Sequence, residues 1–404
     1  FGYTTAIGED LLKIGDWVFL WQGGFALDGW QAAGGAAVLG FFLYMVAFMD
    51  TVATIPTGSM AERWQWKNFV LWGLFCGAIY YPLFGAWTWG GGWLNQLGNN
   101  LELGFGYVDF AGSGVVHAMG GAAALAGAIA IGPRIGKFNA DGSANTIPGH
   151  HIPMALLGTF ILLFGWFGFN AASTFAATDV QFAVVAANTA IAGAFGAVVA
   201  MLWIMKKPNK PDPGMMANGM LAGLVAITAP CAFVTPQVSA LIGTIAAILV
   251  IEAIGFIERR GIDDVVGAIS VHGIGGSFGV LCVGLFADGT YGVGWNLTTE
   301  GAAGAASGVT GIFYDLELGL RQLGAQAIAL VVIWTVMLGI AYAWFKLSDK
   351  ITPLRSAEAD EIGGLDLPEM GALAYPEFEF AIESSDPEIG VRPHIGSARG
   401  SVHE

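Results

Sequence analysis

Charged residues are scarce in this chain of 404 residues, because Asp, Glu, Lys and Arg together make up only 12% of it. Soluble domains carry about 25% charged residues, so the composition argues against an ordinary water-soluble protein. Hydrophobic residues reach 55%, and the chain holds 61 glycines, which allow helices to pack closely in lipid. We therefore predict a protein embedded in the lipid bilayer, with no nucleic-acid partner.

Cysteine is nearly absent as well. Cys76, Cys231 and Cys282 lie scattered in apolar segments without a CxxC pair. This pattern favours buried, inert thiols over a disulfide framework or a metal site. Basic residues are outnumbered, since the formal net charge is −15, but 11 of the 31 acidic residues follow residue 350. The acidity therefore belongs mainly to the C-terminal segment.

Apolar stretches long enough to cross a bilayer, about 20 residues each, fill most of the chain. We predict nine spans, at 36–60, 68–88, 112–132, 152–172, 183–205, 214–232, 235–257, 265–287 and 325–346. An acidic segment with scattered prolines follows them. We therefore predict an all-α polytopic transmembrane domain over 1–346 and a tail over 347–404, partly disordered after about 378. The opening FGYTTAIGEDLLKIGDWVFLWQGG is too polar to span the bilayer.

The basic residues predict how the spans are oriented. They follow every second span: Arg63, Lys67, Arg134, Lys137, Lys206, Lys207, Lys210, Arg259, Arg260, Lys346, Lys350 and Arg355. The other loops hold almost none, with Arg321 as the one clear exception. Basic loops face the cytoplasm. We expect the N-terminal segment outside and the tail inside the cell.

Two of the six histidines lie inside predicted spans. Asp109 precedes His117 by eight residues, and Asp264 precedes His272 by the same number. Aspartate favours helix N-caps, so each acid marks the start of a helix. Eight residues place each ring about 12 Å along its helix, close to the middle of a hydrocarbon core about 30 Å thick. The loop charges predict that the two helices enter from opposite faces.

Ionisable residues inside a membrane are costly, and they often mark functional sites. A lone intramembrane histidine could equally be a packing residue, but a pair at mirrored depths is the pattern of an inverted repeat with its site at the midplane. Glycines beside both rings would let the backbones approach and leave room for a narrow passage. These glycines are Gly112, Gly114, Gly120, Gly121, Gly273, Gly275 and Gly276.

Several ordered motifs resemble those of the ammonium transporter family (Amt/Mep/Rh), and the Amt branch in particular. They are DFAGSGVVH (109–117), GWFGFNAAS (165–173), DDVVGAISVHGIGG (263–276), GSMAERW (58–64) and WGGG (89–92). The resemblance covers about residues 36–370. It implies homotrimers of eleven-helix subunits, built as inverted five-helix repeats plus a final long helix, each with its own channel. Nine visible spans would then lack the N-terminal one to two helices.

The resemblance also implies roles for individual residues. His117 and His272 match the pore histidine pair, and Phe48 and Phe169 match the aromatic gate at the outer end of the pore. In the family such a pore conducts ammonia, and this transport needs no cofactor. The family is one of transporters, so we expect no enzyme activity.

Three further residues match the external recruitment site. Trp89 and Ser173 match the residues of that site, and Asp109 matches the acid that supports the site from beneath it without direct contact. Asp109 could also be only a helix cap. Position 44 departs from relatives that carry a phenylalanine there, because it is Tyr44.

The predicted chemistry is consistent with these residues. Aromatic faces attract cations, and neutral imidazoles offer a hydrogen-bond donor and an acceptor to a passing molecule. We predict that ammonium, or its analogue methylammonium, is captured outside and deprotonated, and that ammonia then passes the histidines while the proton is relayed separately. An ammonium sensor on the same fold is the main alternative. A membrane metalloenzyme would need a third ligand, and no HExxH motif is present.

The tail segment KLSDKITPLR and the later GLDLPEMGALAYPEF resemble the cytoplasmic C-terminal region of the family. The resemblance implies a regulatory tail that couples neighbouring subunits and can receive a PII-type regulatory protein. The expected location is the cell membrane.

Overall fold

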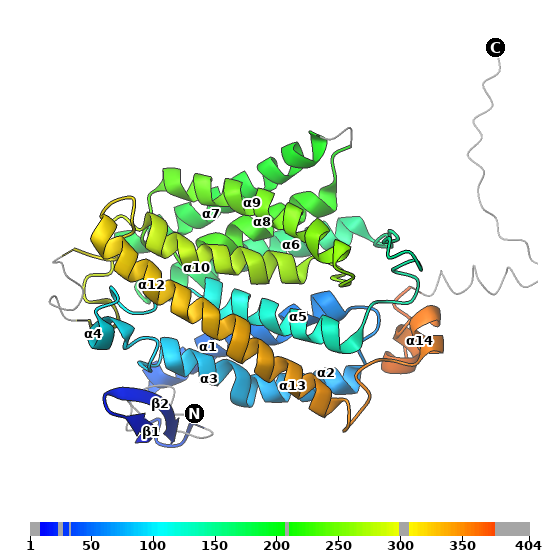
Figure 1. The fold of residues 1–404 in the computed structure, drawn as a ribbon, viewed down its shortest axis with the longest axis horizontal. Coiled ribbons are helices and arrows are strands. Elements are labelled where there is room, and N and C mark those ends of the chain that lie inside the picture. The colour runs from blue at the N-terminus through cyan, green and yellow to red at the C-terminus, as the bar shows by residue number, and fades with distance from the viewer. Residues whose placement is uncertain (1–8, 23–26, 32–33, 207–209, 299–306, 376–404) are drawn as a thin grey trace, which may run out of the picture. The chain divides into compact units, whose positions relative to one another are not determined.

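Helices make up nearly all the regular structure in the computed structural model of the chain (Figure 1), which describes residues 9–22, 27–31, 34–206, 210–298 and 307–375. The chain forms two compact units, Phe1–Arg355 and Ser356–Glu404. Lys207 and the partial disorder predicted after about 378 lie outside the described residues.

Among the described residues, eight helical stretches are long and apolar enough to cross a membrane. They are Ala36–Met60, Trp66–Thr88, Ser113–Ile131, Ile152–Thr174, Val180–Met205, Pro236–Arg259, Ile269–Phe286 and Leu316–Ser348. Each agrees with a predicted span. The ninth prediction, 214–232, corresponds to α8 (Pro213–Ile227), which has only 15 residues because turns replace the helix from Thr228 onward. The structure thus bears out a polytopic helical protein, with one span shorter than predicted.

The first part of the larger unit contains three spans in several pieces: α1 (Ala36–Met60), α2 (Trp66–Phe75), η2 (Cys76–Tyr80), α3 (Tyr81–Thr88), α4 (Leu97–Leu101), η3 (Ser113–Ala118) and α5 (Met119–Ile131). The second part contains α6 (Ile152–Trp166), η4 (Phe167–Ala171), η5 (Ala172–Thr174), α7 (Val180–Met205), α8, α9 (Pro236–Arg259), η6 (Ile269–Ile274), α10 (Gly275–Phe286) and η7 (Trp295–Leu297). The last long helix consists of α12 (Leu316–Val332), η8 (Ile333–Met337) and α13 (Leu338–Ser348). It contacts α10 with its first piece and α5 with its last (Figure 1).

Local sequence signals explain where several helices begin. Asp212 accepts a hydrogen bond from the Met215 amide at 3.1 Å, and Asp315 accepts one from Leu318 at 2.9 Å. Thr235 accepts a longer one, 3.4 Å, from the Val238 amide. Proline follows at the first helical position of both α8 and α9, where its missing N–H has no helical acceptor to lose.

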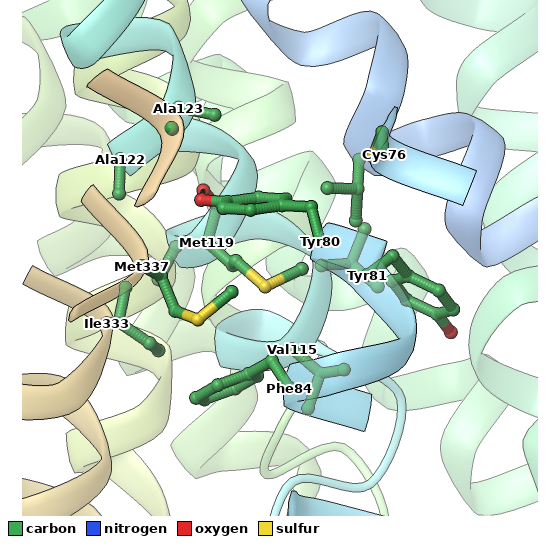
Figure 2. Close-up of a cluster of buried hydrophobic side chains, with 14 of the residues drawn as sticks. Cys76, Tyr80, Tyr81, Phe84, Val115, Met119, Ala122, Ala123, Ile333 and Met337 are labelled. Carbon is green, nitrogen blue, oxygen red and sulfur yellow. Dashed lines mark hydrogen bonds between the residues drawn. The ribbon is translucent and has the colours of Figure 1, made fainter. Parts of the chain in front are cut away.

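The helices that carry the two histidines lie at the centre of the unit. In an apolar stretch of 18 residues within Ser113–Ile131, 83% of the residues are buried inside the protein. The corresponding share is 61% in Ile269–Phe286 and only 11% in Ile152–Thr174. Large side chains fill the space around them. Figure 2 shows Tyr80 and Phe84 packed against Met119 of α5 and Met337 of η8.

A β-hairpin that the sequence analysis did not predict precedes the first span. Strands β1 (Glu9–Ile14) and β2 (Trp17–Gln22) pair antiparallel, and β2 contacts α3. The Trp93 amide donates to the Val18 carbonyl at 3.0 Å, and the Trp87 indole donates to the Phe19 carbonyl at 2.8 Å. The hairpin is thereby attached to the α3 end of its span.

The larger unit continues past its last helix because residues 349–355 bond to the turn between α1 and α2. The Gln65 amide donates to the Leu354 carbonyl at 3.0 Å, and the Asn68 side chain donates to the Thr352 carbonyl at 2.9 Å. The smaller unit contains α14 (Glu358–Gly363) and η9 (Asp366–Met370) in its described part. Within it, the Ser356 hydroxyl donates to the Glu369 carboxylate at 3.1 Å.

Candidate functional site

The structure brings His117 and His272 into contact. Their Nδ1 atoms lie 3.2 Å apart, and the two ring centroids are 5.2 Å apart with planes inclined by 24°. Each histidine lies in a π-helical turn, His117 in η3 and His272 in η6. Such turns insert a residue into a helix and are frequent at functional sites. Residues 155 positions apart thus form one hydrogen-bonded pair.

Glycines allow this contact because the two helices touch through their backbones. A Cβ atom on Gly121 would lie 2.2 Å from the Gly273 amide, and one on Gly276 would lie 2.7 Å from the Ala118 amide. Contacts that come later in the first helix come earlier in the second, since Gly279 reaches Ser113. The helices therefore cross in antiparallel directions, as the loop charges predict.

Two aromatic rings lie against the His117 ring. The centroid of Trp166 lies 5.1 Å from that of His117, with planes inclined by 16°, and the centroid of Phe169 lies 5.6 Å away. His117 is 1% exposed, and its Nε2 atom has no hydrogen-bond partner among the described residues. The pair therefore keeps one ring nitrogen free in a buried, largely apolar space.

Phe48 and Phe169 lie face to face next to this space. Their ring centroids are 3.9 Å apart and their planes differ by 12°. Phe48 comes from α1 and Phe169 from η4, and Phe48 is 1% exposed. The two rings lie in direct contact in this structure, and Phe169 also touches His117. The residues predicted as a gate thus adjoin the residues predicted as a pore.

The predicted recruitment residues lie near Phe48, Trp89 in direct ring contact with it and Ser173 through Tyr44. The Trp89 ring meets Phe48 edge-on at 5.7 Å, and its Nε1 donates to the Asp109 carbonyl at 2.7 Å. The Ser173 hydroxyl donates to the Phe169 carbonyl at 2.6 Å. Ser173 also shares a hydrogen bond with the Tyr44 hydroxyl, and the Tyr44 ring lies 4.3 Å from Phe48. Trp89 and Ser173 are therefore linked through the Phe48 ring.

Asp109 is buried beneath Trp89, and donors surround its carboxylate. Oδ1 accepts from the amides of Gly112 and Ser113, and Oδ2 accepts from those of Gly114 and Val115, all at 2.8–2.9 Å. The Tyr107 hydroxyl also donates to Oδ2, at 2.9 Å. The carboxylate holds the start of η3, and only its backbone carbonyl contacts the Trp89 indole.

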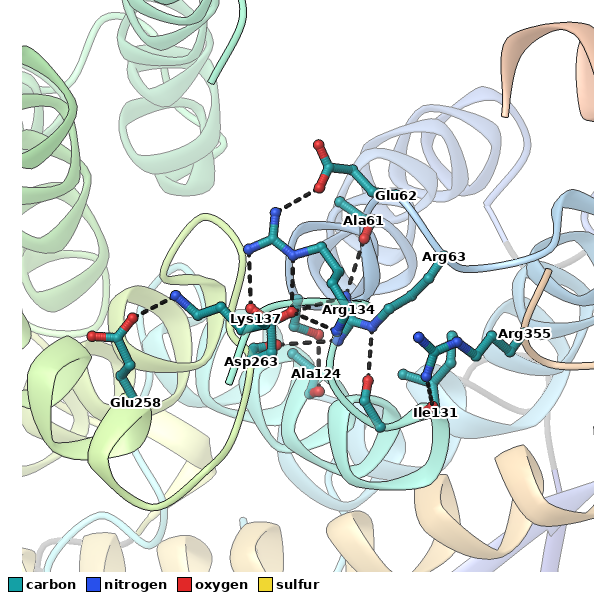
Figure 3. Close-up of polar contacts among 12 residues, drawn as sticks. Ala61, Glu62, Arg63, Ala124, Ile131, Arg134, Lys137, Glu258, Asp263 and Arg355 are labelled. Atoms are coloured by element: carbon teal, nitrogen blue, oxygen red, sulfur yellow. Dashed lines mark hydrogen bonds and ion pairs between the residues drawn. The ribbon is translucent and has the colours of Figure 1, made fainter. Parts of the chain in front are cut away.

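An ion-pair network closes the opposite end of the unit (Figure 3). Asp263 accepts two hydrogen bonds from the Arg134 guanidinium, at 2.8 and 3.1 Å, and its backbone carbonyl accepts one from Arg63 at 3.2 Å. Arg134 also pairs with Glu62 at 2.5 Å. Arg63 is 0% exposed. The network links the chain after α1, the chain after α5 and the chain before η6.

Two interactions near the site were not predicted from the sequence. The Tyr44 hydroxyl bonds to Ser173, and Trp166 stacks on His117. A signal for Tyr44 existed, because Tyr44 and Phe48 are four residues apart and hence on one helix face. In the described ranges, no group of three His, Cys, Asp or Glu residues is placed to hold a metal ion.

The chain is similar in sequence and in structure to known proteins. Residues 1–375 match the Ammonium Transporter Family. The ammonium transporter Amt2 of Archaeoglobus fulgidus is 43% identical over 378 residues, which are 92% of this chain and 78% of the relative. The ammonium transporter Amt1 of Haloferax mediterranei is 35% identical over 373 residues, 89% of this chain and 66% of the relative.

Solved structures agree. One titled "Sensor Amt Protein" superposes with a TM-score of 0.70 at 39% identity, covering 82% of this chain and 76% of that one. Mep2 of Candida albicans superposes with a TM-score of 0.67 at 28% identity, covering 86% of this chain and 71% of that one. The chain has the fold of these proteins. It belongs to the ammonium transporter family, a family of membrane transporters and not of enzymes.

Proposed function

We propose that the protein captures ammonium at its outer aromatic site, removes a proton and conducts ammonia past His117 and His272. The proton crosses separately, by way of the two imidazoles. The observation that carries this proposal is the Nδ1–Nδ1 contact of 3.2 Å between two rings from antiparallel helices, directly behind the Phe48–Phe169 stack.

Capture requires groups that bind a small cation better than water does. The ring faces of Trp89 and Phe48 supply cation–π attraction, about 0.5–2 kcal/mol for each favourable contact. The Ser173 oxygen supplies a hydrogen-bond acceptor for an ammonium N–H. The buried Asp109 carboxylate adds negative charge beneath the site, and its backbone fixes the Trp89 indole.

Passage requires a neutral molecule, because an ion in the middle of the membrane costs several kcal/mol. Ammonia lacks that cost and can hydrogen-bond to imidazole nitrogens along its way. In a neutral pair one Nδ1 donates to the other, so one ring keeps an unprotonated Nε2 and the other ring keeps a protonated one. A proton accepted at the first Nε2 can cross the Nδ1–Nδ1 bond while another leaves the second Nε2.

Further parts of the proposal follow from family membership. We propose a homotrimer in the cell membrane, with the tail from residue 347 in the cytoplasm and the basic loops on the same side. The tail would serve as a regulatory segment and as the docking site for a PII-type protein at the cytoplasmic face. Cross-linking in native membranes and protease access from each side test these two statements.

The central test is solid-supported-membrane electrophysiology on the purified protein, with ammonium, methylammonium and potassium pulses. We expect an ammonium current in the wild type, no potassium current, and at least a tenfold loss of ammonium current in His117→Ala and His272→Ala. His150→Ala, in the loop before α6, is the matched control and should keep the wild-type current. Unchanged currents and selectivity in both pore variants would refute the role of the pair.

A sensor is the second candidate, because a structural relative at 39% identity is titled "Sensor Amt Protein". A sensor would bind methylammonium at the outer site with no steady ammonium current. The same measurement therefore separates the two functions when it is combined with a binding titration.

A further inference from the structure

The segment 105–108, directly before Asp109, is buried although it forms neither helix nor strand. A buried backbone must still pair its N–H and C=O groups, because each unpaired group is costly. All four amides and all four carbonyls of this segment are hydrogen-bonded. The amides of Gly106 and Tyr107 bond to backbone carbonyls, and side-chain amides supply the partners of the other six groups.

Two side chains hold the first three residues of this segment. Gln322 of α12 accepts a hydrogen bond from the Phe105 amide at 3.0 Å and donates one to the Gly106 carbonyl at 2.8 Å. Asn296 of η7 donates to the carbonyls of Phe105 and Tyr107, both at 2.8 Å. The amides of these side chains thus take the place of a neighbouring strand, which would otherwise pair such an extended backbone.

Gln326, one turn further along α12, holds the last residue of the segment on both sides. It accepts from the Val108 amide at 2.9 Å and donates to the Val108 carbonyl at 2.7 Å. Its Nε2 also donates to the Val280 carbonyl of α10 at 3.0 Å. Gln326 is 0% exposed. Both amide hydrogens and the amide oxygen are used, so the side chain is fixed in one orientation.

The carbonyl that follows Val108 is the one that anchors Trp89. The Asp109 carbonyl accepts from the Trp89 indole at 2.7 Å, and the Trp89 ring meets Phe48 edge-on at 5.7 Å. Cation–π attraction depends on where the ring face lies relative to the ion. A shift of the Asp109 carbonyl would therefore turn the indole, and Gln326 fixes the peptide directly before that carbonyl.

We propose that Gln326 is a positioning residue for the outer recruitment site. It fixes the peptide between Val108 and Asp109, and through the Asp109 carbonyl it sets the orientation of the Trp89 ring. Gln322 supports the same segment further from Asp109, so its contribution is smaller. The proposal rests on the proposed function for the identity of the ion that Trp89 meets. It gives α12 a part in ion capture that is exerted through the backbone.

The first test measures binding. Saturation-transfer-difference NMR reports the Kd of methylammonium for the full chain in nanodiscs. Gln326→Met keeps the length of the side chain and removes its hydrogen bonds. We expect it to raise the Kd about three- to tenfold, the range of one weakened cation–π contact, and Gln322→Met to raise it about twofold.

Asn68→Leu is the matched control for the loss of a buried amide. Asn68 is also 0% exposed, donates to the Thr352 carbonyl at 2.9 Å and accepts from the Trp64 indole at 3.2 Å. It lies near the start of the span Trp66–Thr88, whereas Trp89 follows the end of that span. The control variant should lose stability and keep the wild-type Kd.

A double-mutant cycle tests whether the effect passes through Trp89. Trp89→Phe keeps a ring and removes the indole N–H that bonds to the Asp109 carbonyl. In that background Gln326→Met should raise the Kd by less than about twofold, because the two changes break the same chain of contacts. An equal rise in both backgrounds would overturn the positioning role.

Fluorine NMR on protein labelled with fluorotryptophan separates positioning from general destabilisation. The Trp89 resonance, assigned by its loss in Trp89→Phe, should shift in Gln326→Met and stay in place in Asn68→Leu. An unmoved resonance or an unchanged Kd in Gln326→Met overturns the proposal. A wild type that binds methylammonium without an ammonium current removes the transport function and keeps the positioning role. Should Gln326→Met fail to fold, Gln322→Met gives the same two readouts with smaller changes.

Discussion

The two aspartates that precede His117 and His272 occupy equivalent positions but have different surroundings. Asp109 accepts five hydrogen bonds through its two carboxylate oxygens. Asp264 accepts bonds at only one oxygen, from the amides of Ile269 at 2.9 Å and Ser270 at 3.4 Å. Its Oδ1 is shielded from solvent and has no partner in the described part of the chain. One acid is fully bonded and the other is half bonded.

The local sequence accounts for this difference. After Asp109, Gly112 adopts a φ of 108°, which turns four successive amides toward the carboxylate, and Tyr107 adds a hydroxyl. After Asp264 the chain reads VVGA, and the tyrosine position is occupied by Ile262. Burial raises the pKa of Asp264 to about 7, although the amides of Ser270 and Ile269 act to lower it. The repeat thus preserves the place of the acid and not the number of hydrogen bonds that its carboxylate accepts.

Removing the fully bonded acid should have the largest effect. Asp109→Ala leaves four buried amides and one hydroxyl without their acceptor, and each unsatisfied buried group costs about 1–3 kcal/mol. We expect the free energy of unfolding to fall by on the order of 5 kcal/mol, measured by SDS titration with circular dichroism. Asp264→Ala frees only two amides and should cost less than half as much. Equal losses in the two variants would contradict the comparison.

The half-bonded acid should make stability depend on pH. Because the folded pKa of Asp264 lies above its value of 3.8 in the absence of the fold, the folded state binds a proton that the unfolded state has released. The contribution of Asp264 to stability is therefore fully present below pH 4. It falls as the pH rises toward 7, by up to about 1.4 kcal/mol per pH unit. Asp264→Asn should reduce this slope in unfolding titrations between pH 4 and 7, and burial also raises the pKa of Asp109, which would leave a remaining slope of the same sign.

The neighbouring Asp263 provides a control with the opposite sign. Burial acts to raise its pKa, but hydrogen bonds from Arg134 and the positive charges of Arg134 and Arg63 leave the pKa below the usual value. The contribution of Asp263 to the stability of the folded state is therefore present above the pKa that it has in the unfolded chain, and this contribution is lost as the pH falls. Asp263→Asn should therefore lower the free energy of unfolding at neutral pH and reduce its dependence on pH at acid pH. A slope between pH 4 and 7 that is not reduced in Asp264→Asn assigns the titration to another group.

The smallest expected effect concerns Tyr107, whose hydroxyl bonds to Asp109 and which has no counterpart before Asp264. Tyr107→Phe removes one hydrogen bond to the Asp109 carboxylate, which should cost about 1.5 kcal/mol of unfolding free energy. Tyr80→Phe is the matched control, because the Tyr80 hydroxyl donates to the neutral Met119 carbonyl at 3.1 Å. The Tyr107 variant should lose more stability than the Tyr80 variant. The reverse order would show that the bond to the charged group has no special weight.

Composition and spacing predict the elements that lipid and helix geometry dictate. The span predicted at 36–60 agrees with α1 at both ends, because its apolar run has clear limits. The equal spacing of eight residues from acid to histidine predicts that the two rings meet, and the 3.2 Å contact agrees with this expectation. Both predictions depend on local patterns and on the fixed thickness of a membrane.

Long-range side-chain pairing could not be predicted in this way. The bond between Tyr44 and Ser173 joins residues 129 positions apart, and that between Arg63 and Asp263 joins residues 200 positions apart. Arg63 served as a mark of a cytoplasmic loop, yet the structure buries it in an ion pair. The β-hairpin packs against α3, and its turn did have a local signal that the prediction missed: Gly15 and Asp16 lie between Ile14 and Trp17, and Gly15 adopts a φ of 60°. Sequence predicts the scaffold, and tertiary contact decides the partners.

The bond between the two imidazoles has a polarity, because only one of the two facing nitrogens carries hydrogen. In the proposed relay, each proton that crosses the bond would reverse this polarity, so the arrangement of hydrogens on the two rings would differ before and after the crossing. A second charge can follow in the same direction only after both rings have rotated or exchanged hydrogen with their surroundings. Under the proposed function, charge would therefore pass as separate events with a recovery time between them, and the current should level off at high ammonium even where the outer site is never empty.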